Sequence, residues 1–251
     1  MFELLQKTKI PFFNEMVNVS DGAIKTISLF LRQKIMFSTL KINRWFFLPY
    51  ILTAISAIVI ILIFSKASVH LFFNSFFSDF ADIFFKYLTI IGDGIIIPFL
   101  LIMLVFIRFR YAFFLLSTYA ISGLFTQLLK RTFFIKSQRP TIFFEDIAQL
   151  HLVSGVEQLS WKSFPSGHST TAFAIMICFA ILCKNNTLKF LFFILAALIA
   201  YSRVYLSQHF LNDILAGSFI GTITGLWMYQ LIKPLKWEWL DKNVMELKVV
   251  R

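Results

Sequence analysis

The sequence has little cysteine, and it lacks an internal repeat, a low-complexity linker and an apolar stretch near its start. Cys178 and Cys183 lie five residues apart in one apolar segment, so on a helix they face different directions and form no disulfide framework. The first long apolar run begins only near Trp45, so we expect no cleavable signal peptide. We expect this first run to direct membrane insertion, and the absence of repeats and linkers predicts one main domain.

The composition indicates a membrane protein. Hydrophobic residues make up 58% of the chain, the mean hydropathy is +0.77, and 33 of the 251 residues are Phe. Lipid-facing helices need this many large apolar side chains, whereas a soluble domain of this size does not. The formal net charge is +11, but the basic residues are spread between apolar segments rather than gathered in one region. We therefore expect no nucleic-acid partner and interpret most of these charges as determinants of membrane topology.

The pattern of apolar segments predicts an all-α polytopic membrane protein with six transmembrane helices. The expected spans are 46–64, 88–107, 111–129, 165–183, 188–206 and 211–232. In residues 71–87, Phe recurs at helical spacing and polar residues fill the other face, so we expect an amphipathic helix at the membrane interface. Gly217, Gly221 and Gly225 form a stripe that suits close helix packing in lipid.

The distribution of basic residues predicts the topology. We divide the chain into a basic N-terminal segment (1–44), a six-helix membrane domain (45–232) and a short basic cytoplasmic tail (233–251). The N-terminal segment is either a helix on an anionic membrane surface or a solvated cytoplasmic tail. If the N-terminus is cytoplasmic, 16 of the 24 basic residues fall on the cytoplasmic side. We expect an integral plasma membrane protein, in a bacterium the inner membrane, with both termini inside and the histidine-bearing segments outside.

Residues 165–168 read Pro-Ser-Gly-His and come just before an apolar run. Proline is tolerated in a first helical turn, so we expect Pro165 to begin a helix. The backbone N–H groups of Ser166, Gly167 and His168 would then lack intrahelical partners and could bind an anion. The missing Cβ of Gly167 would let an oxyanion approach the backbone, and His168 would be a proton donor beside it. An ordinary helix start with a surface histidine is the alternative for this stretch alone.

A second histidine lies in the segment 202–213, which reads SRVYLSQHFLND. His209 and Asp213 are four residues apart, so on a helix they would share one face, and the carboxylate could orient the ring for nucleophilic attack. Lys130, Arg139 and Arg203 would add fixed positive charge for a phosphoryl group. Each of these residues has an ordinary structural alternative, such as a helix end, a turn or a cap. Their combined order and spacing favours the functional interpretation.

These motifs resemble the signature of the type-2 phosphatidic acid phosphatase superfamily, which is Lys-x6-Arg-Pro, Pro-Ser-Gly-His and Ser-Arg-x5-His-x3-Asp. The second and third parts match in spacing. The first part departs, because Thr132 stands where the lysine is expected and Lys130 is separated from Arg139 by eight residues. We interpret this as a two-residue insertion in which Lys130 keeps the role, with Arg131 and Lys136 as alternatives.

The resemblance implies an integral-membrane lipid phosphate phosphatase without a metal ion or other cofactor. It implies that His209, oriented by Asp213, attacks phosphorus and forms a phosphohistidine, while His168 acts as acid and then as base. Lys130, Arg139, Arg203 and the amides around Ser166 and Gly167 would bind the phosphoryl oxygens. The substrate would be a lipid phosphate of the bilayer: phosphatidic acid, phosphatidylglycerol phosphate, undecaprenyl diphosphate or a lipid A phosphate. A lipid-to-lipid phosphotransferase, a haloperoxidase-like anion site and a non-catalytic lipid carrier or scramblase remain alternatives, and the sequence predicts no oligomeric state.

Overall fold

The computed structural model describes residue 33 and residues 35–247, and it divides into two compact units that meet between Ile42 and Asn43. In the first unit, the described residues 35–42 are helical. The predicted surface helix or solvated tail in 1–44 therefore lies mostly outside the described residues. The second unit contains all of the predicted membrane segments and all of the predicted site residues, and the description below concerns this unit.

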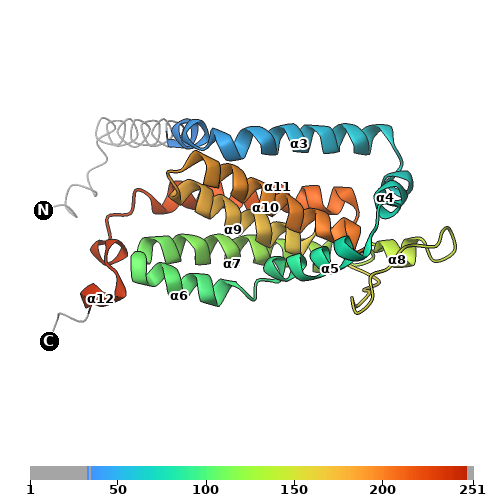
Figure 1. Ribbon diagram of the computed structural model, residues 1–251. Coiled ribbons are helices and arrows are strands. Elements are labelled where there is room, and N and C mark those ends of the chain that lie inside the picture. The colour runs from blue at the N-terminus through green and yellow to red at the C-terminus, as the bar shows by residue number, and fades with distance from the viewer. Residues whose placement is uncertain (1–32, 34, 248–251) are drawn as a thin grey trace, which may run out of the picture. The chain divides into compact units, whose positions relative to one another are not determined.

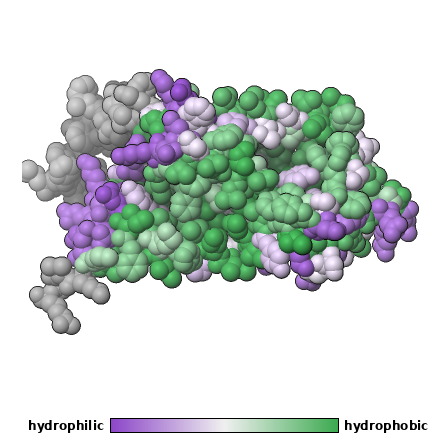
Figure 2. All heavy atoms as spheres, viewed as in Figure 1, coloured by the Kyte–Doolittle hydropathy of each residue, from purple (hydrophilic) through white to green (hydrophobic). Residues whose placement is uncertain are grey.

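Every regular element in the described part of the second unit is helical (Figure 1). The elements are α3 (Arg44–Ile63), α4 (Lys66–Asn74), α5 (Asp79–Leu88), η1 (Thr89–Asp93), α6 (Ile97–Ile107), α7 (Phe109–Thr132), α8 (Pro140–Phe143), α9 (Gly167–Leu182), α10 (Asn186–Tyr205), α11 (Leu211–Ile232), η2 (Glu238–Asp241) and α12 (Val244–Leu247). Hydrophobic side chains cover the middle of the face shown in Figure 2, and hydrophilic residues gather at its two ends. This distribution is the one expected of an integral membrane protein, because a bilayer solvates the apolar band.

The prediction of an all-α membrane protein is confirmed, but the number of spans is approximate. Among the described helices, α3, α7, α10 and α11 are each long and apolar enough to cross a bilayer. The pair formed by 79–93 and α6 makes a fifth span only if it is counted as one bent crossing. α9 has 16 residues, which is shorter than a usual crossing, yet it corresponds to the expected fourth span.

The second span and the Phe-rich helix differ from the prediction. We expected one helix over 71–87 followed by a straight span over 88–107, but the first helix ends at Asn74 and a new one begins at Asp79. Ser78 caps that second start, because its side chain accepts a hydrogen bond from the Ala81 N–H. The chain then tightens into η1, passes Gly94 with φ +83°, and continues as α6 at an angle of 57°. The break therefore lies inside the segment that the apolar pattern predicts as continuous.

α9 is the central helix of the bundle and packs against α7, α10 and α11. Ten of its residues are buried, including Ala172, Ala174 and Ala180, whose small side chains let the neighbouring helices approach. The glycine stripe of α11 faces this helix. A Cβ at Gly217 would lie 2.5 Å from the Ser166 carbonyl oxygen, and a Cβ at Gly221 would lie 2.4 Å from that of Thr170. The predicted close packing is thus made by α11 on α9, with backbone against backbone.

The residues after α11 pack against the beginning of α7. Arg110 donates hydrogen bonds from Nε and Nη2 to the two carboxylate oxygens of Asp241, at 2.9 and 2.7 Å, and from Nη1 to the Ile232 carbonyl. The Phe109 N–H also donates to the carbonyl of Lys242. This contact lies at the end of the unit that carries α12, opposite the end that carries α8 and its loops (Figure 1). The predicted site residues gather toward the α8 end.

Candidate active site

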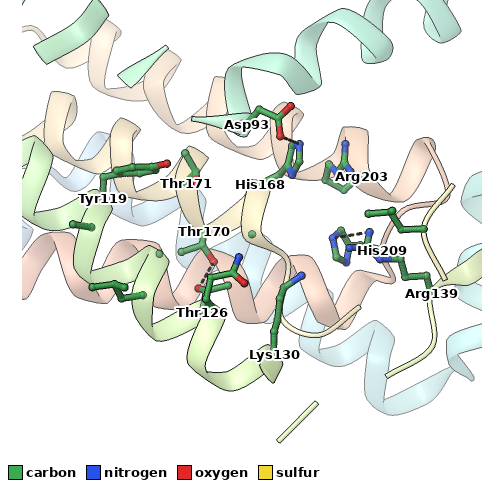
Figure 3. Close-up of a pocket in the computed structure, with 17 residues that line it drawn as sticks. Asp93, Tyr119, Thr126, Lys130, Arg139, His168, Thr170, Thr171, Arg203 and His209 are labelled. Atoms are coloured by element: carbon green, nitrogen blue, oxygen red, sulfur yellow. Dashed lines mark hydrogen bonds and ion pairs between the residues drawn. The ribbon is translucent and has the colours of Figure 1, made fainter. Parts of the chain in front are cut away.

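A cavity of about 600 Å³ lies among α7, α9, α10, η1 and the loops next to them. Lys130 of α7, His168 of α9 and Arg203 of α10 line it together with Arg139 and His209 (Figure 3). These five residues were predicted from three separate parts of the sequence, and the fold brings them to one place. Gly167 also lines the cavity, whereas Ser166 and Asp213 are buried in its wall.

The beginning of α9 differs in detail from the prediction. The helix begins at Gly167 with Ser166 as its N-cap, so Pro165 precedes the cap and is not in the first turn. The Ser166 N–H donates to the Asp213 carbonyl at 2.9 Å and so already has a partner. Gly167 and His168 are the first two helical residues, and their N–H groups have no intrahelical acceptor. A Cβ at Gly167 would meet nothing within 4 Å, so an anion has open space beside these two amides.

His209 and Asp213 meet, although they do not share a helix as we expected. His209 lies in the loop before α11, and Asp213 lies in the first turn of that helix. His209 Nδ1 is 3.4 Å from Asp213 Oδ2, and its Nε2 is 3.4 Å from Arg139 Nη1. A guanidinium only donates hydrogen bonds, so Nε2 is the unprotonated nitrogen and Nδ1 carries the hydrogen that faces the carboxylate. This tautomer places a lone pair on Nε2, which here faces the Arg139 guanidinium at 3.4 Å.

Ser163 completes this pair, and the sequence analysis did not predict it. Its Oγ donates to Asp213 Oδ2 at 2.5 Å and lies 3.4 Å from His209 Nδ1. Asp213 Oδ2 also accepts the Phe210 N–H at 2.9 Å. A buried carboxylate needs such partners, because an unpaired charge away from water is costly. In the sequence, the signal for this role of Ser163 was its hydroxyl group two residues before the Pro-Ser-Gly-His motif.

The loop that carries His209 is fixed by contacts from α4, which the sequence analysis also did not predict. Ser207 has φ +52°, in the left-handed region that a residue with a side chain adopts only when its surroundings hold it there. Its Oγ is 3.2 Å from His70 Nε2 and accepts a hydrogen bond from Asn74 Nδ2 at 3.2 Å. The backbone N–H groups of Gln208 and His209 both donate to the Arg203 carbonyl. The position of the His209 ring is therefore set by its backbone as well as by Asp213.

Three cationic side chains surround the His209 ring. Lys130 Nζ donates to the Lys162 carbonyl at 2.9 Å, and Arg139 donates to the carbonyls of Trp161 and Gln208. Arg203 Nη1 donates to Thr89 Oγ1 at 2.7 Å, while its Nε is buried and has no hydrogen-bond partner among the described residues. All three residues are buried. Clustered buried cations repel one another, so the arrangement favours an anion in the cavity.

The alternatives for the first motif occupy different positions. Arg131 and Lys136 are exposed, and neither lines the cavity. Lys130 lies one residue before Arg131, and on a helix successive side chains point about 100° apart. The geometry is thus consistent with Lys130 as the cation that binds a ligand here.

Burial and charge both act on the His209 ring. Burial lowers the pKa of His209 well below its ordinary value, and the charges of Arg139, Lys130 and Arg203 lower it further. The His209 ring is therefore neutral at neutral pH. Burial also lowers the pKa of Arg139, and the Asp213 carboxylate opposes this shift. The carboxylate that orients His209 thus helps to keep its cationic neighbour charged.

His168 also has a carboxylate partner. Its Nε2 is 2.9 Å from Asp93 Oδ1, and this contact is drawn as a dashed line in Figure 3. Asp93 is the last residue of η1, at the break in the expected second span. The sequence analysis did not include Asp93 in the site. A carboxylate inside an apolar segment, next to two glycines, was the available signal, because such a residue is costly in a membrane without a role.

Fold and site together define a helical membrane protein with a cation-lined cavity that contains two histidines. The family model of the PAP2 superfamily matches residues 111–237, which include both histidines and the three cations. The chain belongs to this superfamily, as the signature motifs indicated.

Curated relatives match the chain over part of its length. The chain is 33% identical to the lipid A 1-phosphatase of Rhizobium etli over 108 residues, which is 43% of this chain and 44% of the relative. It is 29% identical to the lipid A 4'-phosphatase of Porphyromonas gingivalis over 80 residues, 32% of this chain and 34% of the relative. The chain thus spans less than half the length of these relatives.

Two solved structures share the fold. The crystal structure of Aquifex aeolicus LpxE matches with a TM-score of 0.59 and 29% identity, over 65% of this chain and 94% of that chain. The transmembrane PAP2-type phosphatidylglycerolphosphate phosphatase of Bacillus subtilis matches with a TM-score of 0.56 and 20% identity, over 77% and 97%. The second likeness concerns the fold alone.

Proposed function

We propose that this protein hydrolyses the phosphate of a membrane lipid by way of a phosphohistidine on His209. The observation that carries the proposal is the position of His209, whose Nε2 is 3.4 Å from Arg139 Nη1 in a cavity lined by Lys130, Arg139 and Arg203. These cations would bind the phosphoryl oxygens and stabilise the charge that develops on them. The amides of Gly167 and His168 would supply further donors.

The reaction has two steps, and the two histidines have different roles in it. In the first step, Nε2 of His209 forms a bond to phosphorus while the ester P–O bond breaks, and protonated His168 gives its proton to the departing oxygen. In the second step, water attacks phosphorus, the P–N bond breaks, and His168 takes a proton from the water. The lipid alcohol and inorganic phosphate leave, and both histidines return to their starting states.

The substrate that the relatives favour is a lipid A phosphate. Two of the named relatives are lipid A phosphatases from Rhizobium etli and Porphyromonas gingivalis. A phosphatidate-type lipid is the second candidate, since a putative phosphatidate phosphatase of Drosophila melanogaster is 36% identical over 84 residues. Both lipids present a phosphate monoester at the membrane surface, which is the group that the cavity suits.

The test is phosphate release by the purified protein in mixed micelles. The panel contains lipid A with a phosphate at position 1 or 4', phosphatidic acid, phosphatidylglycerol phosphate and undecaprenyl diphosphate, and mass spectrometry identifies the products. We expect release from at least one lipid, and we expect it to persist in EDTA because three fixed cations supply the positive charge. Phosphate appearing on a second lipid would indicate a phosphotransferase, and no turnover of any lipid would contradict the proposal.

We also propose that both termini are cytoplasmic and that the site opens on the outer face, since most basic residues then lie inside. A cysteine placed at Ser160 should react with an impermeant maleimide outside intact cells, and one placed at Asn185 should not. Cys178 and Cys183 are replaced with alanine beforehand, so that only the introduced thiol reacts. The reverse labelling pattern would place the site in the cytoplasm.

A further inference from the structure

η1 interrupts the second membrane segment beside the cavity. Its first and last residues contact two residues that line the cavity, Arg203 and His168. Thr89 accepts the hydrogen bond from Arg203 Nη1 at 2.7 Å, and Asp93 Oδ1 is 2.9 Å from His168 Nε2. Between them, Gly92 is so close to α9 and α10 that a Cβ would lie 3.2 Å from the His168 side chain and 2.8 Å from that of Ile199. The break at η1 therefore places the Asp93 carboxylate beside the His168 ring.

We propose that Asp93 is a positioning residue for the reaction, which holds His168 with its Nε2 hydrogen toward η1 and its Nδ1 toward the substrate. The proposal rests on the proposed function, and it adds a residue outside the three signature motifs to that site. Asp93 acts through His168 and has no contact with the phosphoryl group in this assignment.

The contact with Asp93 matters for the protonation of His168, because the other charges near this ring are positive. The acid role requires an imidazolium, yet Lys130, Arg139 and Arg203 line the same cavity, and like charges disfavour another cation there. The Asp93 carboxylate accepts the Nε2 hydrogen and offsets part of this repulsion. The proton that moves is then on Nδ1: it passes to the ester oxygen when the P–O bond breaks, and a proton from water replaces it when the P–N bond breaks. Nε2 keeps its hydrogen throughout both steps.

The experiment compares two substrates that differ in their need for an acid. The leaving group of p-nitrophenyl phosphate is a stable anion that departs without a proton, whereas the alkoxide of dioctanoyl phosphatidic acid needs one. In Asp93→Asn, we expect kcat/KM for the alkyl phosphate to fall about ten- to a hundred-fold, a part of what a general acid contributes. For the aryl phosphate we expect a loss of less than about three-fold, because kcat/KM reports the steps up to phosphorylation of His209.

Two variants are matched controls. Thr89→Val removes the other contact of η1, the one to Arg203, and should lower kcat/KM for both substrates by the same factor, because Arg203 acts on the phosphoryl group. Asp146→Asn removes a carboxylate from an exposed position after α8 and should leave both values unchanged. Asp93→Glu keeps the charge and should restore part of the alkyl phosphate activity; it also serves as the test variant if Asp93→Asn does not accumulate in the membrane.

The outcomes separate this inference from the proposed function. A selective loss on the alkyl phosphate supports the positioning role of Asp93. Equal losses on both substrates, or no loss, overturn that role and leave the phosphatase assignment intact. If the wild-type protein acts on lipid A 4'-phosphate and not on phosphatidic acid, the former is the alkyl phosphate of this comparison. Failure of the wild-type protein to release phosphate from any lipid of the panel contradicts the proposed function, and the role of Asp93 falls with it.

Discussion

The two histidine–carboxylate pairs of the cavity differ in exposure. The side chains of His209 and Asp213 are 2% and 3% exposed, whereas those of His168 and Asp93 are 21% and 49% exposed. The first pair is also held by the Ser163 hydroxyl and by the backbone of the loop before α11. The second pair joins two elements that are far apart in sequence, α9 and η1.

The difference corresponds to the two proposed chemical tasks. A nucleophile must stay in one position and remain unprotonated, and burial provides both conditions. An acid that later becomes a base must exchange its proton during each cycle, so it needs access to the cavity and its water. The same two residue types are therefore suited to different tasks by their surroundings.

Removing each histidine tests this division of tasks most strongly. We expect His209→Ala to lower lipid phosphate turnover by about a thousand-fold or more and to abolish phosphoenzyme formation. His168→Ala should lower turnover comparably, yet with p-nitrophenyl phosphate it should still form the phosphohistidine and hydrolyse it slowly. The measurement is trapping of acid-labile radiolabelled phosphate on the protein. Accumulation of phosphoenzyme in His209→Ala instead would reverse the two roles.

Removing Lys130, one of the three cations that line the cavity, should give the next largest effect. We expect Lys130→Ala to lower turnover about ten- to a thousand-fold, as the loss of one charge-stabilising donor does. Arg131→Ala and Lys136→Ala are the controls, and each should cost much less because these residues are exposed and do not line the cavity. Turnover of one lipid phosphate is measured for all three variants at equal protein levels. A larger loss in either control would mean that the first motif is aligned wrongly.

Ser163→Ala should give a smaller loss, because it removes support from Asp213 but leaves the Phe210 N–H in place. We expect kcat to fall about ten- to a hundred-fold, as for a lost hydrogen bond to a charged group, with little change in KM. Ser160→Ala removes a hydroxyl from the same loop and is the matched control. Equal activity of the two variants would show that the Ser163 hydroxyl contributes nothing to the buried pair.

A third histidine, His70, is buried and contacts no carboxylate among the described residues, and its protonation should affect stability. Its ring packs on Phe144 and Phe210, and burial lowers its pKa from 6.5 to about 4. The unfolded chain then binds a proton below pH 6.5 that the folded protein binds only near pH 4. Stability is therefore present above pH 6.5 and is lost as the pH falls toward 4, on the order of 2 kcal/mol at pH 5.

The measurement for His70 is thermal unfolding in detergent at pH 7 and pH 5. The wild-type Tm should be lower at pH 5, and His70→Phe, which keeps an aromatic ring at this position, should show a smaller difference between the two pH values. An equal difference in both proteins would mean that other groups cause the acid sensitivity.

The sequence was sufficient to predict the helices and the three signature motifs, because apolar runs and fixed spacings are local properties. It was not sufficient for the break at η1, since an apolar pattern over 88–107 is equally compatible with a straight helix. Asp93, Ser163 and His70 were missed for a related reason. Each acts on a residue that is distant in sequence or lies outside its motif, and only the tertiary fold shows which ring or carboxylate it contacts.

The short length of α9 determines how deep the cavity lies. α9 has 16 residues and α10 has 20, and only three residues connect the two helices at their shared end. At 1.5 Å per residue, the beginning of α9 lies about 6 Å short of the far end of α10. The amides of Gly167 and His168 therefore lie about 6 Å below the level at which α10 ends. Under the proposed function, a lipid phosphate would have to pass below the level at which α10 ends to reach these two amides.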